Sequence, residues 1–218
     1  MGSYRQYCPI ARATEILGER WSVLVVRNLL MGAETFNAIA AGVPTMSRSV
    51  LVRRLTELTR AGVVTTSPKP GGGSTYHLTE AGRDLAGVVD QLGRWGTTWL
   101  DVTSEHSDPG FALWAWCQTQ LDTSALPTAR TVVRFTFPEE RPTNRRYWIL
   151  VDHGTAELCF ADPGGGEPDV DVVAESMAFV DWHRGARSWA ASVRSGGIVA
   201  TGRRDLVRSL PRWNTCRP

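Results

Sequence analysis

One set of side chains in the first half of the chain has the chemistry to bind double-stranded DNA. The set is basic and rich in hydroxyl groups, and it consists of Thr45, Ser47, Arg48, Ser49, Arg53 and Arg54. Arginine pairs with the O6 and N7 atoms of guanine, and hydroxyl groups bind bases or phosphates. Because these residues follow one another closely, a single element must present them, and the pattern favours recognition of a DNA groove.

A helix-turn-helix is the element predicted around this set. The segment Phe36–Ala41 is expected to form the first helix, and Ser47 is placed to cap a second helix that ends at Gly62. Leucines recur at helical spacing along the second helix and predict its buried face: Leu51, Leu55 and Leu58. The arginines and hydroxyl groups then lie on its outward face.

A β-hairpin is predicted directly after this helix. Residues 63–67 and 75–78 are β-prone, and a loop rich in glycine and proline joins them. A hairpin in this position is a wing that lies along the DNA backbone, and its loop carries Lys69, the only lysine of the chain. The alternative is a core helix beside an ordinary surface hairpin.

Several motifs resemble the HxlR-type winged-helix regulators over about the first hundred residues. In order along the chain they are Tyr7-Cys8-Pro9-Ile10, Leu17-Gly18-Glu19-Arg20-Trp21, Phe36-Asn37, Leu55-Thr56-Glu57-Leu58, Gly62-Val63 and Tyr76-His77-Leu78-Thr79-Glu80-Ala81-Gly82. The resemblance implies a homodimer that binds promoters. Two departures are an arginine at position 20, where a lysine is usual, and a glycine-rich wing with little charge.

The helices beside the DNA-reading element are predicted to form the dimer. The segment Pro9–Leu17 and residues 21–30 read as helices, and Thr79 is placed to begin a long third helix. The apolar stripe of the third helix is longer than its own core needs: Leu85, Val88, Val89, Leu92, Trp95 and Trp99. We expect part of this stripe to contact a second copy, which would place two recognition helices one DNA turn apart, about 34 Å. In the alternative, Trp95 and Trp99 pack under a second domain.

With 218 residues the chain is long enough for two small domains, which we expect at residues 1–103 and 104–218, and its order of helices and strands predicts an α+β fold. The first 100 residues carry 11 basic against 7 acidic side chains, and the remainder carries 13 against 15. A basic front half suits a nucleic-acid partner, and the rear half suits another role. There is no run of about eighteen apolar residues and no signal-peptide pattern, so we expect a cytoplasmic protein without a membrane partner.

The second domain is predicted to contain a mainly antiparallel sheet with helices. β-prone runs cover residues 131–137, 147–151, 156–161 and 170–175, and helical patterns cover 111–121, 176–184 and 186–195. The ending, with Ser188-Trp189, Ser195-Gly196, Thr201-Gly202 and Leu206, Leu210 and Trp213, resembles a sterol-carrier-protein-like lipid-binding domain.

That resemblance implies a curved sheet with helices over one face and an enclosed apolar cavity. The residues expected to line the cavity are Trp148, Phe160, Met177, Phe179, Trp182, Trp189 and Trp213. In the alternative, these large side chains fill a core and leave no space for a ligand.

Cys8 is the one residue of the first domain with reactive chemistry. It falls at the start of the first predicted helix with Arg5 and Arg12 nearby, and such surroundings stabilise a thiolate. Some HxlR-type relatives sense oxidants or electrophiles with a cysteine in this place. The alternative role is packing.

Catalysis and metal binding find no support in the sequence. The four histidines are scattered, the four cysteines lack paired spacing, and there is no hydrolase or nucleotide-loop motif, so no catalytic residue, metal or cofactor is expected. The predicted function is a homodimeric transcription regulator that binds an inverted-repeat operator, with an apolar small molecule as the expected effector. Two alternatives are a thiol-based sensor through Cys8 and a lipid carrier or scaffold whose winged helix binds protein.

Overall fold

The chain folds into two compact units, Met1–Asp101 and Val102–Pro218. The computed structural model describes residues 3–69 and 71–216, so Pro70 of the predicted wing loop lies outside the described residues. The division falls two residues before the boundary expected from the sequence. In the part of the chain that is described, no helix is long and apolar enough to cross a bilayer.

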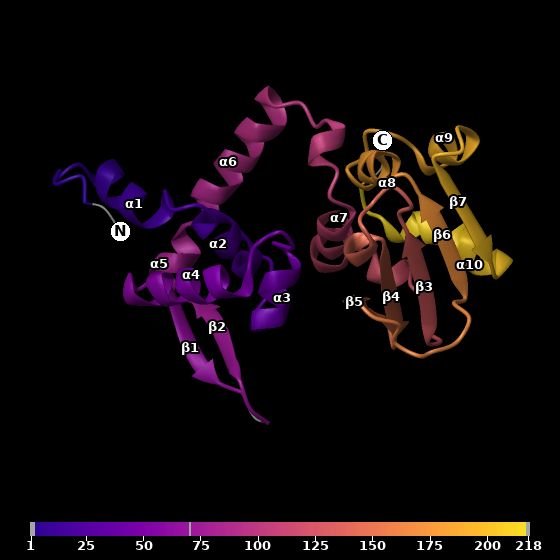
Figure 1. Ribbon diagram of the computed structural model, residues 1–218, viewed down its shortest axis with the longest axis horizontal. Helices are drawn as coiled ribbons and strands as arrows, with labels where there is room; N and C mark the ends of the chain where they lie inside the picture. Colours follow the sequence, from indigo (N-terminus) through magenta and orange to yellow (C-terminus); the bar gives the residue numbers. More distant parts are fainter. Residues whose placement is uncertain (1–2, 70, 217–218) are drawn as a thin grey trace. The chain divides into compact units, whose positions relative to one another are not determined.

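The first unit contains six helices and a hairpin among its described residues (Figure 1). Its elements are α1 (Pro9–Leu17), α2 (Ser22–Leu30), α3 (Phe36–Ala41), α4 (Arg48–Arg60), β1 (Val64–Pro68), β2 (Ser74–Leu78), α5 (Glu80–Asp84) and α6 (Ala86–Trp99). The predicted helix-turn-helix and wing are therefore confirmed, with bounds within about one residue of those expected.

Local capping explains why the helix-turn-helix begins and ends where it does. The hydroxyl of Thr35 accepts a hydrogen bond from the backbone N–H of Ala38 at 3.2 Å at the start of α3. Ser47 accepts from Val50 at 3.4 Å at the start of α4. At the other end of α4, the N–H of Val63 donates to the carbonyl of Leu58 at 3.0 Å, which is the Schellman arrangement. Gly62 permits it because its φ is +73°.

The single long helix expected after Thr79 is divided into α5 and α6. The hydroxyl of Thr79 donates to the carbonyl of Gly62 at 2.6 Å and accepts from the N–H of Gly82 at 3.1 Å, which ties α5 to the end of α4. Gly82 packs so closely on the carbonyl of Val63 that a Cβ atom there would lie 2.2 Å from its oxygen. The helix breaks at Leu85 and restarts as α6.

Polar groups inside the first unit hold α2 against α3. The amide of Asn28, which is fully buried, donates to the carbonyl of Ile39 at 2.8 Å, and Arg27 donates to the carbonyl of Gly42 at 2.7 Å. Burial lowers the pKa of Arg27 to about 10, so its guanidinium stays charged at neutral pH. These bonds fix the first helix of the helix-turn-helix on its support.

The second unit is an α+β fold around a five-stranded sheet. The strands lie in the order β5-β4-β3-β6-β7. Their bounds are β3 (Thr131–Thr136), β4 (Arg146–Asp152), β5 (Thr155–Cys159), β6 (Val170–Ala174) and β7 (Ile198–Gly202). β3 pairs parallel with β6 and the other pairings are antiparallel, which confirms the antiparallel-rich sheet. The strand β7 was not assigned from the sequence.

Helices cover one face of this sheet. They are α7 (Pro109–Ala115), which continues as a π-helical turn over Trp116–Gln120, then α8 (Ser176–His183), α9 (Trp189–Arg194) and α10 (Arg204–Ser209). Along β3 buried and half-buried residues alternate, so Val133 and Phe135 point into the core while Arg134 lies on the opposite face. Burial of alternate residues fixes the register, because a slip by one would expose the whole core face.

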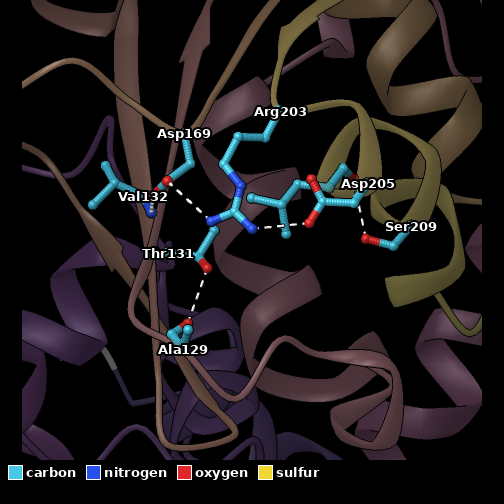
Figure 2. A network of polar contacts seen from close by, with 8 residues as sticks. Ala129, Thr131, Val132, Asp169, Arg203, Asp205 and Ser209 are labelled. Atoms are coloured by element: carbon cyan, nitrogen blue, oxygen red, sulfur yellow. Dashed lines mark hydrogen bonds and ion pairs between the residues drawn. The ribbon is translucent and has the colours of Figure 1, made fainter.

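An ion-paired turn stabilises the end of the sheet at which β6 begins (Figure 2). The carboxylate of Asp169 accepts from the N–H of Val132 at 2.9 Å and lies 3.7 Å from the guanidinium of Arg203. Arg203 also donates to Asp205 at 2.9 Å, at the start of α10. Gly202 has a φ of +123°, and a Cβ atom there would lie 2.3 Å from the carbonyl oxygen of Asp169. This network has a structural role between β3, β6 and β7.

Candidate nucleic-acid interface

The outward face of α4 brings together most of the polar residues predicted to bind DNA. Thr45, Ser47, Ser49 and Arg53 are all exposed. The hydroxyls of Ser47 and Ser49 lie 3.2 Å apart. Arg53 has no ion pair or hydrogen bond with any described residue, so its guanidinium is free to meet a base or a phosphate. Arg53 can therefore enter a groove without first breaking a contact with a described residue.

Arg48 is also exposed, but its guanidinium is held in place by α3. It donates to the side-chain carbonyl of Asn37 at 3.0 Å and lies 4.7 Å from the centre of the Phe36 ring. Such a cation–π contact contributes about 0.5–1 kcal/mol at an exposed site. Arg48 is thus oriented before DNA arrives, whereas Arg53 is not.

Arg54 corrects the sequence prediction, because its side chain points into the protein. The residue is 5% exposed and forms ion pairs with Glu19, at 3.2 Å, and with Glu57. The reason is helical spacing: Arg54 follows Leu51 by three residues and precedes Leu58 by four, so it shares their buried face. It supports α4 rather than contacting DNA.

Two further residues of the outward face were not among the predicted DNA contacts. Val52 is 53% exposed, and Thr56 is exposed beside it, one helical turn along α4. An apolar side chain at this position can contact the methyl group of thymine. The helical spacing that identifies the buried leucines also places Val52 and Thr56 on the outward face, as observed.

The wing is anchored on the helix-turn-helix by backbone hydrogen bonding. β1 and β2 pair antiparallel from Val64↔Leu78 to Pro68↔Ser74. The N–H of Tyr76 donates to the carbonyl of Glu34 at 2.8 Å, and Glu34 also lies 3.3 Å from His77. Lys69 begins the loop between the strands and is exposed. The wing thus presents one cation on a hairpin whose base is fixed.

An exposed apolar stripe runs along α6. It consists of Val88, Leu92, Trp95 and Trp99, which recur every three or four residues, and Trp99 is 72% exposed. Across its 14 residues α6 has no buried residue. At the N-terminal end of the unit's sequence, Tyr7 before α1 and Ile10 within it are also exposed. Soluble chains rarely leave such a stripe open, so this surface is suited to a protein contact.

The four cysteines are all free thiols of intermediate exposure. Cys8 lies at the N-cap of α1, where its carbonyl accepts from the N–H of Arg12 at 3.0 Å. Burial raises the pKa of Cys117 to about 12, and burial likewise raises the pKa of Cys159. Cys117 and Cys159 are therefore poor nucleophiles. The described residues contain no group of three or more His, Cys, Asp and Glu side chains suited to a metal ion.

The aromatic cavity expected in the second unit is instead a filled core. Phe179, Trp182 and Trp213 are buried, and the rings of Trp116 and Trp182 meet edge to face with centroids 5.1 Å apart. Rings of this size pack efficiently in such a geometry. The other candidates are also displaced from a common cavity: Trp189 packs on Trp182, Trp148 lies on the sheet face away from the helices, and Phe160 is exposed.

A pocket of about 700 Å³ does exist in this unit, at a different place. Met177 is the only one of the predicted cavity residues among those described to line it. The pocket lies where β6 ends and β7 begins, and acidic and apolar side chains share its wall.

A helix-turn-helix followed by a wing, with a basic and hydroxyl-bearing second helix, defines the class of winged-helix DNA-binding proteins. The HxlR-like helix-turn-helix family model matches residues 16–104, and the chain belongs to this family of transcriptional regulators.

Three curated relatives show how far the similarity extends. The chain is 37% identical over 99 residues to the HTH-type transcriptional regulator YvaP of Bacillus subtilis (strain 168), covering 44% of this chain and 92% of that protein. It is 34% identical over 114 residues to the regulator MT3179 of Mycobacterium tuberculosis, covering 46% and 72%. It is 32% identical over 91 residues to YodB of Bacillus subtilis (strain 168), covering 40% and 81%. Each of these matches covers less than half of this chain.

Proposed function

We propose that the protein is a homodimeric transcription regulator that reads an inverted-repeat operator through α4 and its wing. The observation that carries the proposal is the outward face of α4, where Ser49, Val52 and Arg53 are exposed together beside the oriented guanidinium of Arg48. About four exposed side chains on one helix in each copy are suited to reading base edges in the major groove. Lys69 would bind phosphate from the wing.

Sequencing of genomic fragments that the purified full chain retains tests this proposal. We expect an enriched inverted repeat, and operator binding by Arg53→Ala should be weaker by about 1–3 kcal/mol with relaxed preference at one base pair. Arg146→Ala is the matched control, since this arginine is exposed on β4 of the other unit. Unchanged operator binding by Arg53→Ala would contradict the assignment of α4. Binding to protein but to no DNA would favour the scaffold alternative.

The proposal of a homodimer rests on the apolar stripe of α6. A twofold dimer contacts itself through the same surface on both copies, and a stripe of Val88, Leu92, Trp95 and Trp99 is self-complementary in this sense. Light scattering of the full chain should give twice the chain mass of 24.0 kDa. Leu92→Asp should yield monomers that bind the operator poorly, whereas Thr97→Asp on the same helix is the control. A monomeric wild type would contradict the proposal.

The second unit is proposed to bind a small-molecule effector. Its support is a pocket of about 700 Å³, a size typical of ligand sites, in a chain that also carries a winged helix-turn-helix. A sterol-carrier-like identity for this unit stays a prediction from the sequence. An effector must bind the DNA-free and DNA-bound forms with different affinity, typically by 1–3 kcal/mol. Normal regulation by residues 1–103 alone would contradict an effector role.

A further inference from the structure

The pocket of the second unit combines an apolar floor with an acidic wall; we name it the acidic groove. The floor contains Val173 and Val199, which are paired across β6 and β7, together with Met177. Both valines are partly exposed, at 39% and 50%. The wall carries three carboxylates, Glu139, Glu140 and Glu175, and no basic side chain is among the described residues that line the groove.

Two of the carboxylates are held in place by the first residue of α8. Glu139 accepts a hydrogen bond from the backbone N–H of Ser176, and Glu140 accepts from the Ser176 hydroxyl at 2.8 Å. Glu175 precedes the helix, and its N–H donates to the carbonyl of Gly197 at 2.9 Å. The carboxylate of Glu175 is exposed and forms no hydrogen bond or ion pair with any described residue.

The negative charge of this wall exceeds the positive charge that contacts it among the described residues. The N-terminus of a helix is equivalent to about half a positive charge. Arg145 adds one nearby cation, since its guanidinium donates to the backbone carbonyl of Glu140 at 3.2 Å. The three carboxylates carry three negative charges, and the N-terminus of α8 and Arg145 together offset about one and a half of them. More than one negative charge therefore faces a groove with an apolar floor.

The spacing of the carboxylates argues against a metal ion as their partner. The described residues contain no cluster of three or more acidic, histidine or cysteine side chains that could hold one. Carboxylates distributed along a wall above an apolar floor instead complement a larger cation with an apolar body. A volume of about 700 Å³ is sufficient for a molecule of that kind.

We propose that the acidic groove binds an organic cation with an apolar body, such as a lipophilic phosphonium or quaternary ammonium compound. The apolar body would cover Val173, Val199 and Met177, and the positive charge would lie beside Glu175. Binding itself is independent of DNA; only the role of such a cation as an effector rests on the proposed regulatory function.

Calorimetric titration of the full chain with two matched probes tests the proposal without DNA present. Tetraphenylphosphonium and tetraphenylborate have nearly the same shape and opposite charge. We expect saturable binding of the phosphonium and at least tenfold weaker binding of the borate. Glu175→Gln should weaken phosphonium binding about two- to fivefold, as expected for one charge pair exposed to solvent. Val199→Trp, which fills the floor, should abolish it.

The control variant is Glu157→Gln, which removes an exposed carboxylate of β5 outside the groove and should bind the phosphonium as the wild type does. Equal affinity for both probes, unchanged binding by Glu175→Gln and Val199→Trp, or no saturable phosphonium binding would each overturn the proposal. Urea midpoints of the variants show whether they are folded. Operator binding measured on the same preparation separates failure of the groove from failure of the DNA-binding function.

Discussion

Arg54 of the recognition helix and Glu19 of the turn before α2 form an ion pair at 3.2 Å, although 35 positions separate them in the sequence. Glu57, one turn along α4, contacts the same guanidinium. The ion pair holds α4 against the turn that precedes α2. The orientation of the outward face of α4 therefore depends on Arg54, whose charge faces inward.

Adjacent arginines of α4 should therefore respond in opposite ways to truncation. Arg54→Ala should destabilise the DNA-binding unit by about 1–3 kcal/mol, because it leaves two carboxylates without their partner. This loss of stability is smaller than that expected for breaking a fully buried ion pair, because the Glu19 side chain is 41% exposed. Arg53→Ala should change stability by less than about 0.5 kcal/mol and instead weaken DNA binding.

Urea unfolding of both variants, together with their operator affinity, distinguishes the two roles. Arg54→Lys is the informative intermediate, because it keeps the charge but loses the second donor arm, and it should recover part of the stability. If Arg54→Ala were as stable as the wild type, the inward ion pair would have no supporting role.

Lys69 should contribute to DNA binding without contributing to sequence preference. A cation on the wing neutralises a phosphate, so Lys69→Ala should weaken binding to operator and random DNA alike and reduce the slope of log affinity against log salt by about one unit. Binding measured at several salt concentrations gives this slope. A loss confined to the operator would instead place Lys69 at a base edge.

The elements of the DNA-binding unit were predictable because their signals are local. Thr35 and Ser47 cap the helices they precede, and Gly62 supplies the left-handed conformation that ends α4. The inward position of Arg54 was also within reach, since it lies three residues from Leu51, but a basic side chain gave no reason to expect burial. Its partner Glu19 is distant in sequence, so only the tertiary fold reveals the pair.

The second unit was less predictable, because whether its aromatic side chains line a cavity or fill a core depends on tertiary packing. Aromatic residues such as Phe179 and Trp213 are equally compatible with a cavity lining and with a filled core, and only their mutual contacts decide between the two. β7 lies in a glycine-containing segment whose strand character depends on pairing with β6. The acidic groove assembles Glu139 and Glu175 from separate loops, which no local pattern indicates.

The thiols should separate by reactivity in the folded protein. With a pKa of about 12, the thiolate fraction of Cys117 at pH 8 is about 10⁻⁴, so alkylation by iodoacetamide should leave this residue almost unmodified. Peptide mass spectrometry after brief labelling checks this, with urea-unfolded protein as the control.

If Cys8 is a switch, mild oxidant should release DNA from the wild type but not from Cys8→Ser. Equal release from both proteins would leave Cys8 with a packing role.

Acid should destabilise the second unit through His183 on α8. This histidine is 7% exposed, and its Nδ1 has no hydrogen-bond partner among the described residues. Burial lowers its pKa from 6.5 to about 4, because the charged imidazolium would lose its hydration. Below pH 6.5 the unfolded chain therefore binds a proton that the folded chain does not. The stabilisation that depends on a neutral His183 is fully present above pH 6.5. It is lost as the pH falls toward 4, and the loss lowers the free energy of unfolding by about 3 kcal/mol for this group alone.

Urea unfolding followed by tryptophan emission measures this loss, since six of the nine tryptophans lie in the second unit. The free energy of unfolding of the wild type should fall between pH 7 and pH 4 by about 3 kcal/mol more than that of His183→Gln, because glutamine cannot take up the proton. The exposed His106 provides the matched control, and His106→Gln should keep the pH dependence of the wild type. If wild type and His183→Gln lost stability in parallel, the buried imidazole would not be the origin of the acid sensitivity.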